Sequence, residues 1–174
     1  MSTPLRIAIV GTGNFGTLHA ETVSRLPGAL LCALVDSDTA RANTLARRVG
    51  VNTVFASLDE LIAARAADAI VIASRADSHL PLAAQAAAAG LHLLVEKPLA
   101  NSANEIRSFQ SRLGETSTVL MVDHLCLFHS LIVPAAARLR ETGFRALHFT
   151  RHRPEAIGQH FPDDHPIQLT MVHD

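Results

Sequence analysis

The 174-residue sequence contains no tryptophan, no tyrosine, two cysteines and, at Lys97, a single lysine. Both cysteines, Cys32 and Cys126, lie in apolar, strand-like runs, which fits the reducing cytoplasm better than a disulfide framework. No run of about 18 apolar residues is present and no early apolar stretch has signal-peptide flanks, so we expect a cytoplasmic protein without a membrane partner. The net charge of −1 argues against nucleic acid as a partner.

Apolar residues, in contrast, make up 48% of the chain, enough to bury a core. They gather in short runs separated by helical patterns, which predicts βαβ units and a parallel sheet. Because these runs are almost continuously apolar, the sheet is expected to be covered on both faces, which indicates an α/β, Rossmann-like, doubly wound fold. The predicted strands are 5–10, 30–35, 51–55, 69–73, 91–95 and 118–122.

The pattern divides the chain near residue 122. Residues 1–122 form the predicted nucleotide-binding domain, and residues 123–174 look like the beginning of a second α/β domain for substrate binding or oligomerisation. In that second part we expect a helix over 131–142, a strand over 145–151 and the start of a helix at 166. The strand would present open edges, which invite pairing with another chain, so we expect a homo-oligomer.

The most informative stretch is the one in which the first strand runs into Gly11-Thr12-Gly13-Asn14-Phe15-Gly16. A helical pattern follows at once, which is the context that the G-x-G-x-x-G dinucleotide fingerprint requires. Gly11 allows the tight turn, Gly13 the approach of a pyrophosphate, and Gly16 the close packing of helix and strand. Asn14 and Phe15 open the helix, whose free N–H groups would bind the phosphates. The alternative is a glycine-rich turn in an ordinary α/β protein.

Asp36 supports the nucleotide interpretation. It ends the second strand about 20 residues after Gly16, where the fingerprint places an acidic residue. A carboxylate there accepts both ribose hydroxyls and repels a 2′-phosphate, which favours NAD as the cofactor over NADP. Arg41 and Arg47 leave NADP open as the alternative, because a nearby arginine can accommodate that phosphate.

The fourth strand is followed by Ser74 and His79, which we expect to line the cofactor crevice, since ligands of such sheets bind at the carboxyl ends of strands. The alternative is that Ser78 caps the next helix and His79 packs beside it.

The fifth strand ends in Glu96-Lys97-Pro98. A partly desolvated ammonium beside a cationic nicotinamide should have a lowered pKa and could exchange a proton with a substrate hydroxyl as hydride leaves the carbon. Lys97 is therefore the candidate general acid/base. Glu96 would orient it or a ribose hydroxyl, and Pro98 would fix the backbone. The alternative is a surface lysine beside a turn proline.

These motifs together resemble the N-terminal half of the glucose–fructose oxidoreductase/inositol dehydrogenase (Gfo/Idh/MocA) family, and Glu96-Lys97-Pro98 is the most specific of them. The resemblance implies an NAD(P)-dependent enzyme that oxidises or reduces a hydroxyl on a sugar or cyclitol, with Lys97 at the position of the catalytic lysine and with no metal. By the same resemblance His173 is its catalytic partner. The family has an aspartate four residues before this histidine, whereas this chain has Leu169.

Family members contain a complete second domain, and three interpretations follow for this shorter chain. We expect a fragment or truncated form of a full oxidoreductase. The alternatives are a short protein that completes its sheet by dimerising, and a non-catalytic nucleotide-binding or regulatory module. The residue at position 169 favours the module.

Overall fold

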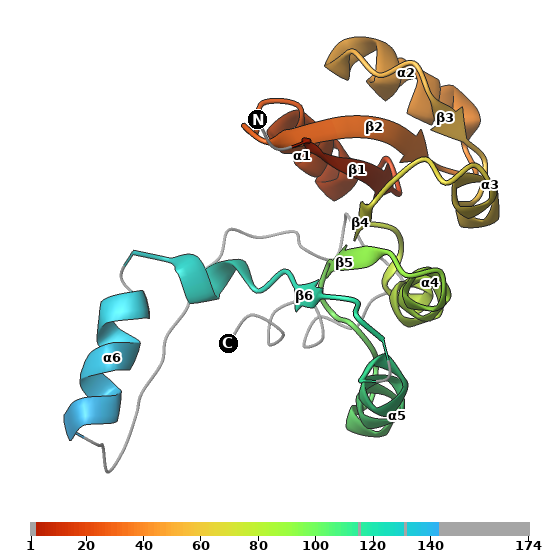
Figure 1. The fold of residues 1–174 in the computed structure, drawn as a ribbon. Helices are drawn as coiled ribbons and strands as arrows, with labels where there is room; N and C mark the ends of the chain where they lie inside the picture. The colour runs from red at the N-terminus through yellow and green to blue at the C-terminus, as the bar shows by residue number, and fades with distance from the viewer. Residues whose placement is uncertain (1–2, 115, 131, 143–174) are drawn as a thin grey trace. The chain divides into compact units, whose positions relative to one another are not determined.

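The computed structural model describes residues 3–114, 116–130 and 132–142, which fall into two units divided after Asp123 (Figure 1). The first unit contains one sheet of six parallel strands in the order β3-β2-β1-β4-β5-β6. The strands are β1 (Leu5–Val10), β2 (Ala29–Val35), β3 (Val54–Phe55), β4 (Ala69–Ile72), β5 (His92–Val95) and β6 (Leu120–Val122). The strand order reverses between β1 and β4, which creates a topological switch point at the centre of the sheet.

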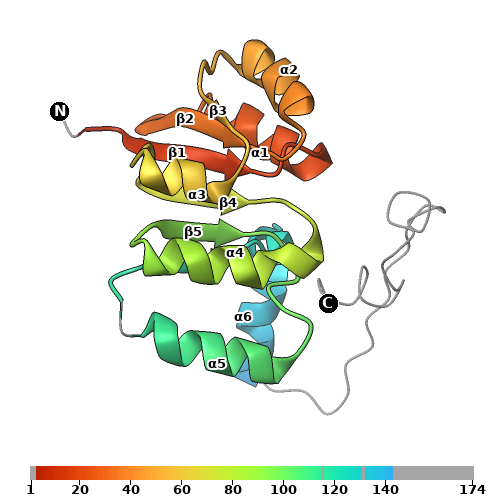
Figure 2. The same cartoon turned by 90° about the vertical axis from the view of Figure 1, so that its right-hand side faces the viewer.

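Helices cover both faces of this sheet, and Figure 2 shows α3, α4 and α5 in front of the strands. One face packs against α1 (Asn14–Val23) and α2 (Thr39–Val49), the other against α3 (Leu58–Ala63), α4 (Ala76–Ala88) and α5 (Ala103–Leu113). Alternate residues of a central strand enter different cores: Ala8 and Val10 belong to the cluster with α3, α4 and α5, and Ile9 belongs to the cluster with α1 and α2. The predicted α/β, doubly wound parallel sheet is therefore confirmed, and the double burial explains why its strands are apolar throughout.

Helix ends follow local sequence signals. The Asp38 carboxylate caps α2 by accepting the Arg41 N–H at 3.0 Å, and Gly50 ends that helix in the left-handed region at φ +77°. At the start of α5, the Ser102 hydroxyl accepts the Glu105 N–H while the Glu105 carboxylate accepts the Ser102 N–H, a complete capping box.

Two boundaries differ from the predictions. Ser57-Leu58-Asp59-Glu60 resembles a capping box and predicts a helix to about Ala66, but α3 ends at Ala63 because the chain reverses through Arg65 at φ +48°. The reversal lets the Asp68 carboxylate pair with the Arg6 guanidinium at 2.6 Å. The helix α4 begins at Ala76 and not at His79, with Pro81 inside it.

The second unit is described only through its first part. It contains a 3₁₀ turn, η1 (Leu125–Phe128), and the helix α6 (Ile132–Thr142), which matches the helix expected over 131–142. The expected strand over 145–151, the helix from 166, Leu169 and His173 lie outside the described residues. The role of residues 123–174 as a second domain stays a prediction. Within the described part, no helix is long and apolar enough to cross a membrane.

The capping box at the start of α5 yields a stability prediction. Ser102→Ala removes the hydroxyl that accepts the Glu105 N–H, so the free energy of unfolding should fall by about 1 kcal/mol, measured by urea denaturation. Ser111→Ala is the matched control, because Ser111 is exposed on the same helix and bonds only the Ser108 carbonyl group. Equal losses in the two variants would contradict the capping role.

Candidate functional site

The polar residues singled out by sequence come together at one edge of the sheet. Because all six strands are parallel, their carboxyl ends face the same way, and the switch point between β1 and β4 lies at the middle of that edge. The residues that follow the strands there are Gly11 after β1, Asp36 after β2, Ala73 and Ser74 after β4, Glu96 and Lys97 after β5, and Asp123 after β6.

The glycine turn between β1 and α1 is tight at two of its three glycines. Gly11 has φ +92°, and a Cβ at this position would lie 2.7 Å from the Ala73 carbonyl oxygen and from the backbone of Ser74. A Cβ at Gly16 would overlap the carbonyl oxygen of Gly11. Both glycines therefore allow β1, α1 and the end of β4 to approach one another more closely than any other residue would permit.

The third glycine faces open space. Gly13 is the N-cap of α1, and no side chain caps the helix at this point. A Cβ added at Gly13 would have no neighbouring atom within 4 Å. The first turn of α1, with Asn14 and Phe15, therefore begins beside space that a ligand can enter, with its N–H groups and the positive end of the helix dipole directed there.

A groove of about 600 Å³ lies between this turn and α2. It is lined by Thr12, Gly13, Asn14 and Thr17 on one side and by Asp38, Ala40, Arg41, Thr44, Leu45 and Arg48 on the other. The groove is large enough for part of a dinucleotide. Arg47, which the sequence suggested for a 2′-phosphate, is instead exposed and bonds Thr44, whereas Arg48 lines the groove and pairs with Glu21 at 3.0 Å.

Asp36 is 7% exposed and contacts two of the residues that line the groove, Thr12 and Arg41. Its carboxylate accepts hydrogen bonds from the Thr12 N–H at 2.7 Å, the Thr12 hydroxyl at 2.6 Å, the Asp38 N–H at 2.9 Å and the Arg41 guanidinium at 2.9 Å. Burial alone would raise the pKa of Asp36, but these bonds outweigh it and hold that pKa below its usual value. Asp36 is therefore a fixed negative charge, and Thr12 is a partner that the glycine spacing alone did not reveal.

Ser74 and His79 connect the turns after β4 and β5. The Ser74 hydroxyl lies 2.7 Å from the Ser78 hydroxyl. The His79 ring is 2% exposed, with Nδ1 2.8 Å from the Pro98 carbonyl oxygen and Nε2 3.1 Å from the Ser74 carbonyl oxygen. The structure thus buries His79 between the two turns, and its ring nitrogens join them. Ser78 lies inside α4 and does not cap it, since the N-cap is Arg75.

Lys97 lies at the same edge, followed by a cis peptide bond to Pro98. Its Nζ is 6.0 Å from the centroid of the Phe15 ring, which belongs to the glycine turn. Glu96 is 6% exposed, and its Oε2 accepts the Lys97 N–H at 3.3 Å. Burial opposes ionisation of Glu96, but the hydrogen bond and charge of His19 and the charge of Lys97 together lower the pKa of this carboxyl.

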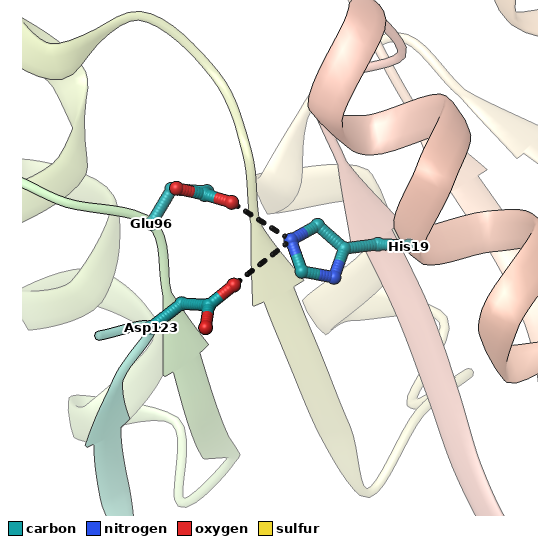
Figure 3. A group of neighbouring side chains, drawn as sticks. All are labelled: His19, Glu96 and Asp123. Atoms are coloured by element: carbon teal, nitrogen blue, oxygen red, sulfur yellow. Dashed lines mark hydrogen bonds and ion pairs between the residues drawn. The ribbon is translucent and has the colours of Figure 1, made fainter. Parts of the chain in front are cut away.

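Two members of the site were not found from the sequence. His19, on α1, places Nε2 3.0 Å from Glu96 Oε1 and 3.6 Å from Asp123 Oδ2 (Figure 3). Asp123 is 8% exposed and directly follows β6, as Glu96 follows β5. The available signal for Asp123 was its position immediately after an apolar strand, the position that Asp36 has after β2 and Glu96 after β5. His19 offered a weaker one, at one helical turn from Phe15 in α1.

Comparison with known proteins identifies a protein family that this chain matches. A family model described as an oxidoreductase family with an NAD-binding Rossmann fold matches residues 5–124. Inositol 2-dehydrogenase of Corynebacterium glutamicum (strain R) is 30% identical over all of this chain and 53% of its own length. The enzyme of the same name from Rubrobacter xylanophilus is 41% identical over 61% of this chain and 30% of its own length. The chain thus spans about half or less of these relatives.

Solved structures of related enzymes resemble the fold of this chain. The structure of scyllo-inositol dehydrogenase from Lactobacillus casei with bound NAD(H) and scyllo-inositol has a TM-score of 0.73 at 25% identity, covering 80% of this chain and 42% of that one. GenD2 from gentamicin A biosynthesis, in complex with NAD, has a TM-score of 0.74 at 35% identity, covering 82% of this chain and 42% of its own. The family match confirms the predicted NAD-binding Rossmann fold.

The different surroundings of Gly13 and Gly16 predict different consequences of adding one methyl group. Gly16→Ala should destabilise the fold by about 1–3 kcal/mol, because its Cβ meets the main chain of Gly11. Gly13→Ala should leave thermal unfolding nearly unchanged but weaken NADH binding at least about tenfold, because its Cβ enters the space that the phosphates need. Thermal melts and NADH fluorescence titrations measure both effects. Normal NADH binding by Gly13→Ala would contradict the placement of the pyrophosphate.

The depressed pKa of Asp36 predicts an acid-dependent loss of stability. Its ionised form stabilises the fold above the unfolded-state pKa of about 3.9, and this contribution disappears as the pH falls through the lower folded-state pKa. In Asp36→Asn, the free energy of unfolding should therefore depend less steeply on pH below about pH 5. Asp77→Asn, at an exposed position in α4, removes the same charge without touching Asp36. Identical pH slopes for Asp36→Asn and the wild type would refute this role.

Proposed function

The chain belongs to the Gfo/Idh/MocA family of oxidoreductases with an NAD-binding Rossmann fold, and from this membership we propose that it transfers a hydride between NAD and a hydroxyl-bearing carbon of a cyclitol, a sugar or a similar small polyol. The observation that carries the proposal is the position of Lys97. The only lysine of the chain follows β5 at the edge where the glycine turn and Asp36 also lie, with its ammonium over the ring of Phe15.

The residues present fit the cofactor. Gly11, Gly13 and Gly16 shape the turn, and the open start of α1 at Asn14 and Phe15 would receive the pyrophosphate. Asp36, which is bonded to the groove residues Thr12 and Arg41, would meet the adenosine ribose and disfavour a 2′-phosphate. Bound NAD⁺ supplies the hydride acceptor. Ser74 and Glu96 would line the crevice, and His79 would position its walls.

Lys97 would do the proton chemistry. In oxidation, the C–H bond of the substrate breaks as its electron pair leaves with the hydride, the hydroxyl becomes a carbonyl group, and the hydroxyl proton passes to Lys97 Nζ. An amine accepts this proton only when its ammonium pKa is lowered by desolvation and by positive charge nearby. By resemblance to the family, His173 is the proposed second acid/base residue, with Leu169 in place of the usual aspartate.

Substrate, assembly and location are part of the same proposal. The cyclitol class is supported by the names of the relatives, two of which are inositol 2-dehydrogenases. NAD is proposed over NADP, with Arg41 and Arg48 beside the groove as the feature that would favour NADP. A homo-oligomer in the cytoplasm, without nucleic acid or membrane as partner, remains our expectation; both cysteines are free and partly buried.

Substitution of Lys97 tests the mechanism. Lys97→Met and Lys97→Arg should still bind NADH, yet lower NAD⁺ reduction with myo-inositol at least about 100-fold, since neither side chain exchanges a proton near neutral pH. Binding is followed by nicotinamide fluorescence with NADH and NADPH, against a low background because the chain lacks tryptophan and tyrosine. Turnover is followed by NADH absorbance.

The outcomes separate the two function classes. Turnover by the wild type that Lys97→Arg retains would refute the acid/base role of Lys97. Saturable NADH binding without turnover by the wild type, across a panel of inositols and sugars, would instead favour a non-catalytic nucleotide-binding module.

A further inference from the structure

The hydrogen-bonding capacity of the Asp36 carboxylate is filled by the protein itself. Oδ1 accepts the Asp38 N–H and the Arg41 guanidinium, both at 2.9 Å. Oδ2 accepts the Thr12 N–H at 2.7 Å, the Thr12 hydroxyl at 2.6 Å and the same Arg41 nitrogen at 2.9 Å. A carboxylate offers about four lone-pair positions. The two ribose hydroxyls of a dinucleotide can therefore bond to Asp36 only if one of these donors leaves.

The burial of Asp36 leads to the same conclusion. Its side chain is 5% exposed, whereas that of Arg41 is 52% exposed. The groove between the glycine turn and α2 is lined by Thr12 and Arg41 but not by Asp36. A ligand in the groove therefore meets these two partners of the carboxylate before it meets the carboxylate itself.

Arg41 is the donor that can leave. The Thr12 N–H belongs to the glycine turn and the Asp38 N–H to the N-cap of α2, so neither moves without the main chain. Thr12 is 3% exposed, which confines its hydroxyl as well. The Arg41 side chain is long and half-exposed, so water can solvate its guanidinium once it turns away. The carboxylate keeps its place and its charge, because the donors of Thr12 and Asp38 still hold it.

We propose that Arg41 occupies the ribose-binding side of Asp36 and must be displaced by the adenosine ribose, so that it lowers the affinity for NAD and reduces the preference for NAD over NADP. This inference rests on the proposed function, because it concerns binding of the same cofactor. In the exchange, the ribose hydroxyls donate to the carboxylate and the Arg41–Asp36 ion pair is lost. Water and salt weaken a half-exposed ion pair, so its loss should cost about two- to fivefold in affinity.

The same guanidinium has the opposite effect on a 2′-phosphate. Asp36 repels this group, whereas Arg41 can pair with it after turning away from the carboxylate. Arg41 therefore weakens the binding of the cofactor that lacks the phosphate and strengthens the binding of the cofactor that carries it. One side chain thus brings the two affinities closer together.

The variant Arg41→Met tests this displacement. Methionine keeps an apolar stem on α2 but forms no ion pair, and the main-chain N–H of residue 41 still donates to the Asp38 cap. NADH should bind about two- to fivefold more tightly than it binds the wild type, since no ion pair has to be broken. NADPH should bind at least about threefold more weakly. Nicotinamide fluorescence measures both affinities, and thermal melts compare the folding of the two chains.

The variant Arg48→Met is the matched control. Arg48 lies on the same helix, lines the same groove and has a side chain that is 56% exposed, but it pairs with Glu21 and not with Asp36. Its substitution removes one positive charge beside the groove and leaves the carboxylate covered. NADH should therefore not bind more tightly to Arg48→Met than to the wild type.

Weaker or unchanged NADH binding by Arg41→Met would overturn the proposal, because Arg41 would then assist the cofactor or lie clear of it. Equal tightening in Arg48→Met would overturn it too, since the effect would not depend on Asp36. A failure of the proposed function gives a different result. If neither the wild type nor Arg41→Met binds NADH, the cofactor site and this inference are both wrong, whereas NADH binding without turnover leaves the Arg41 result standing.

Discussion

The contact on which the site depends is the close packing of α1 against the end of β1 at Gly16 and Gly11. No Cβ fits at Gly16, so the first turn of α1 lies directly against the carbonyl group of Gly11. This close contact between α1 and Gly11 determines the position of the rest of the helix. It leaves the helix N-terminus open at Gly13, brings Phe15 beneath Lys97 and brings His19 to Glu96 and Asp123. The turn that would bind phosphates and the lysine that would exchange the proton are thus held by one short helix.

The carboxylates at this edge of the sheet are stabilised by hydrogen-bond donors from the protein and not by exposure to solvent. Asp36 and Glu96 are both buried at the carboxyl ends of strands, and each is kept ionised by a set of donors that outweighs the cost of desolvation. The donors come from neighbouring segments of the chain, Thr12 and Arg41 for Asp36 and His19 for Glu96. Preorganised charges of this kind need little rearrangement when a ligand binds.

Much of this architecture could be predicted from the sequence because its signals are local. The apolar runs indicated the strands, and Asp38, Ser102 and Gly50 lie at helix ends, where their residue types are favoured. The glycine spacing and Asp36 indicated the edge where ligands bind. Thr12, His19 and Asp123 could not be assigned in the same way. Thr12 acquires its role only when β1 and β2 pair and bring it to Asp36, and His19 and Asp123 acquire theirs only when α1 packs near the ends of β5 and β6. Likewise, the Arg6–Asp68 pair beyond the end of α3 joins residues far apart in the chain, so the sequence alone did not indicate it.

The lengths of the outermost strands have a consequence for self-association. The sheet ends in β3, two residues long, on one side and in β6, three residues long, on the other. A strand from a second molecule that docked at either margin would find very few free main-chain groups to bond, and such short margins protect sheet proteins from aggregation. Within the described residues, the two margins of this sheet therefore offer little backbone for the addition of a strand from a neighbouring molecule.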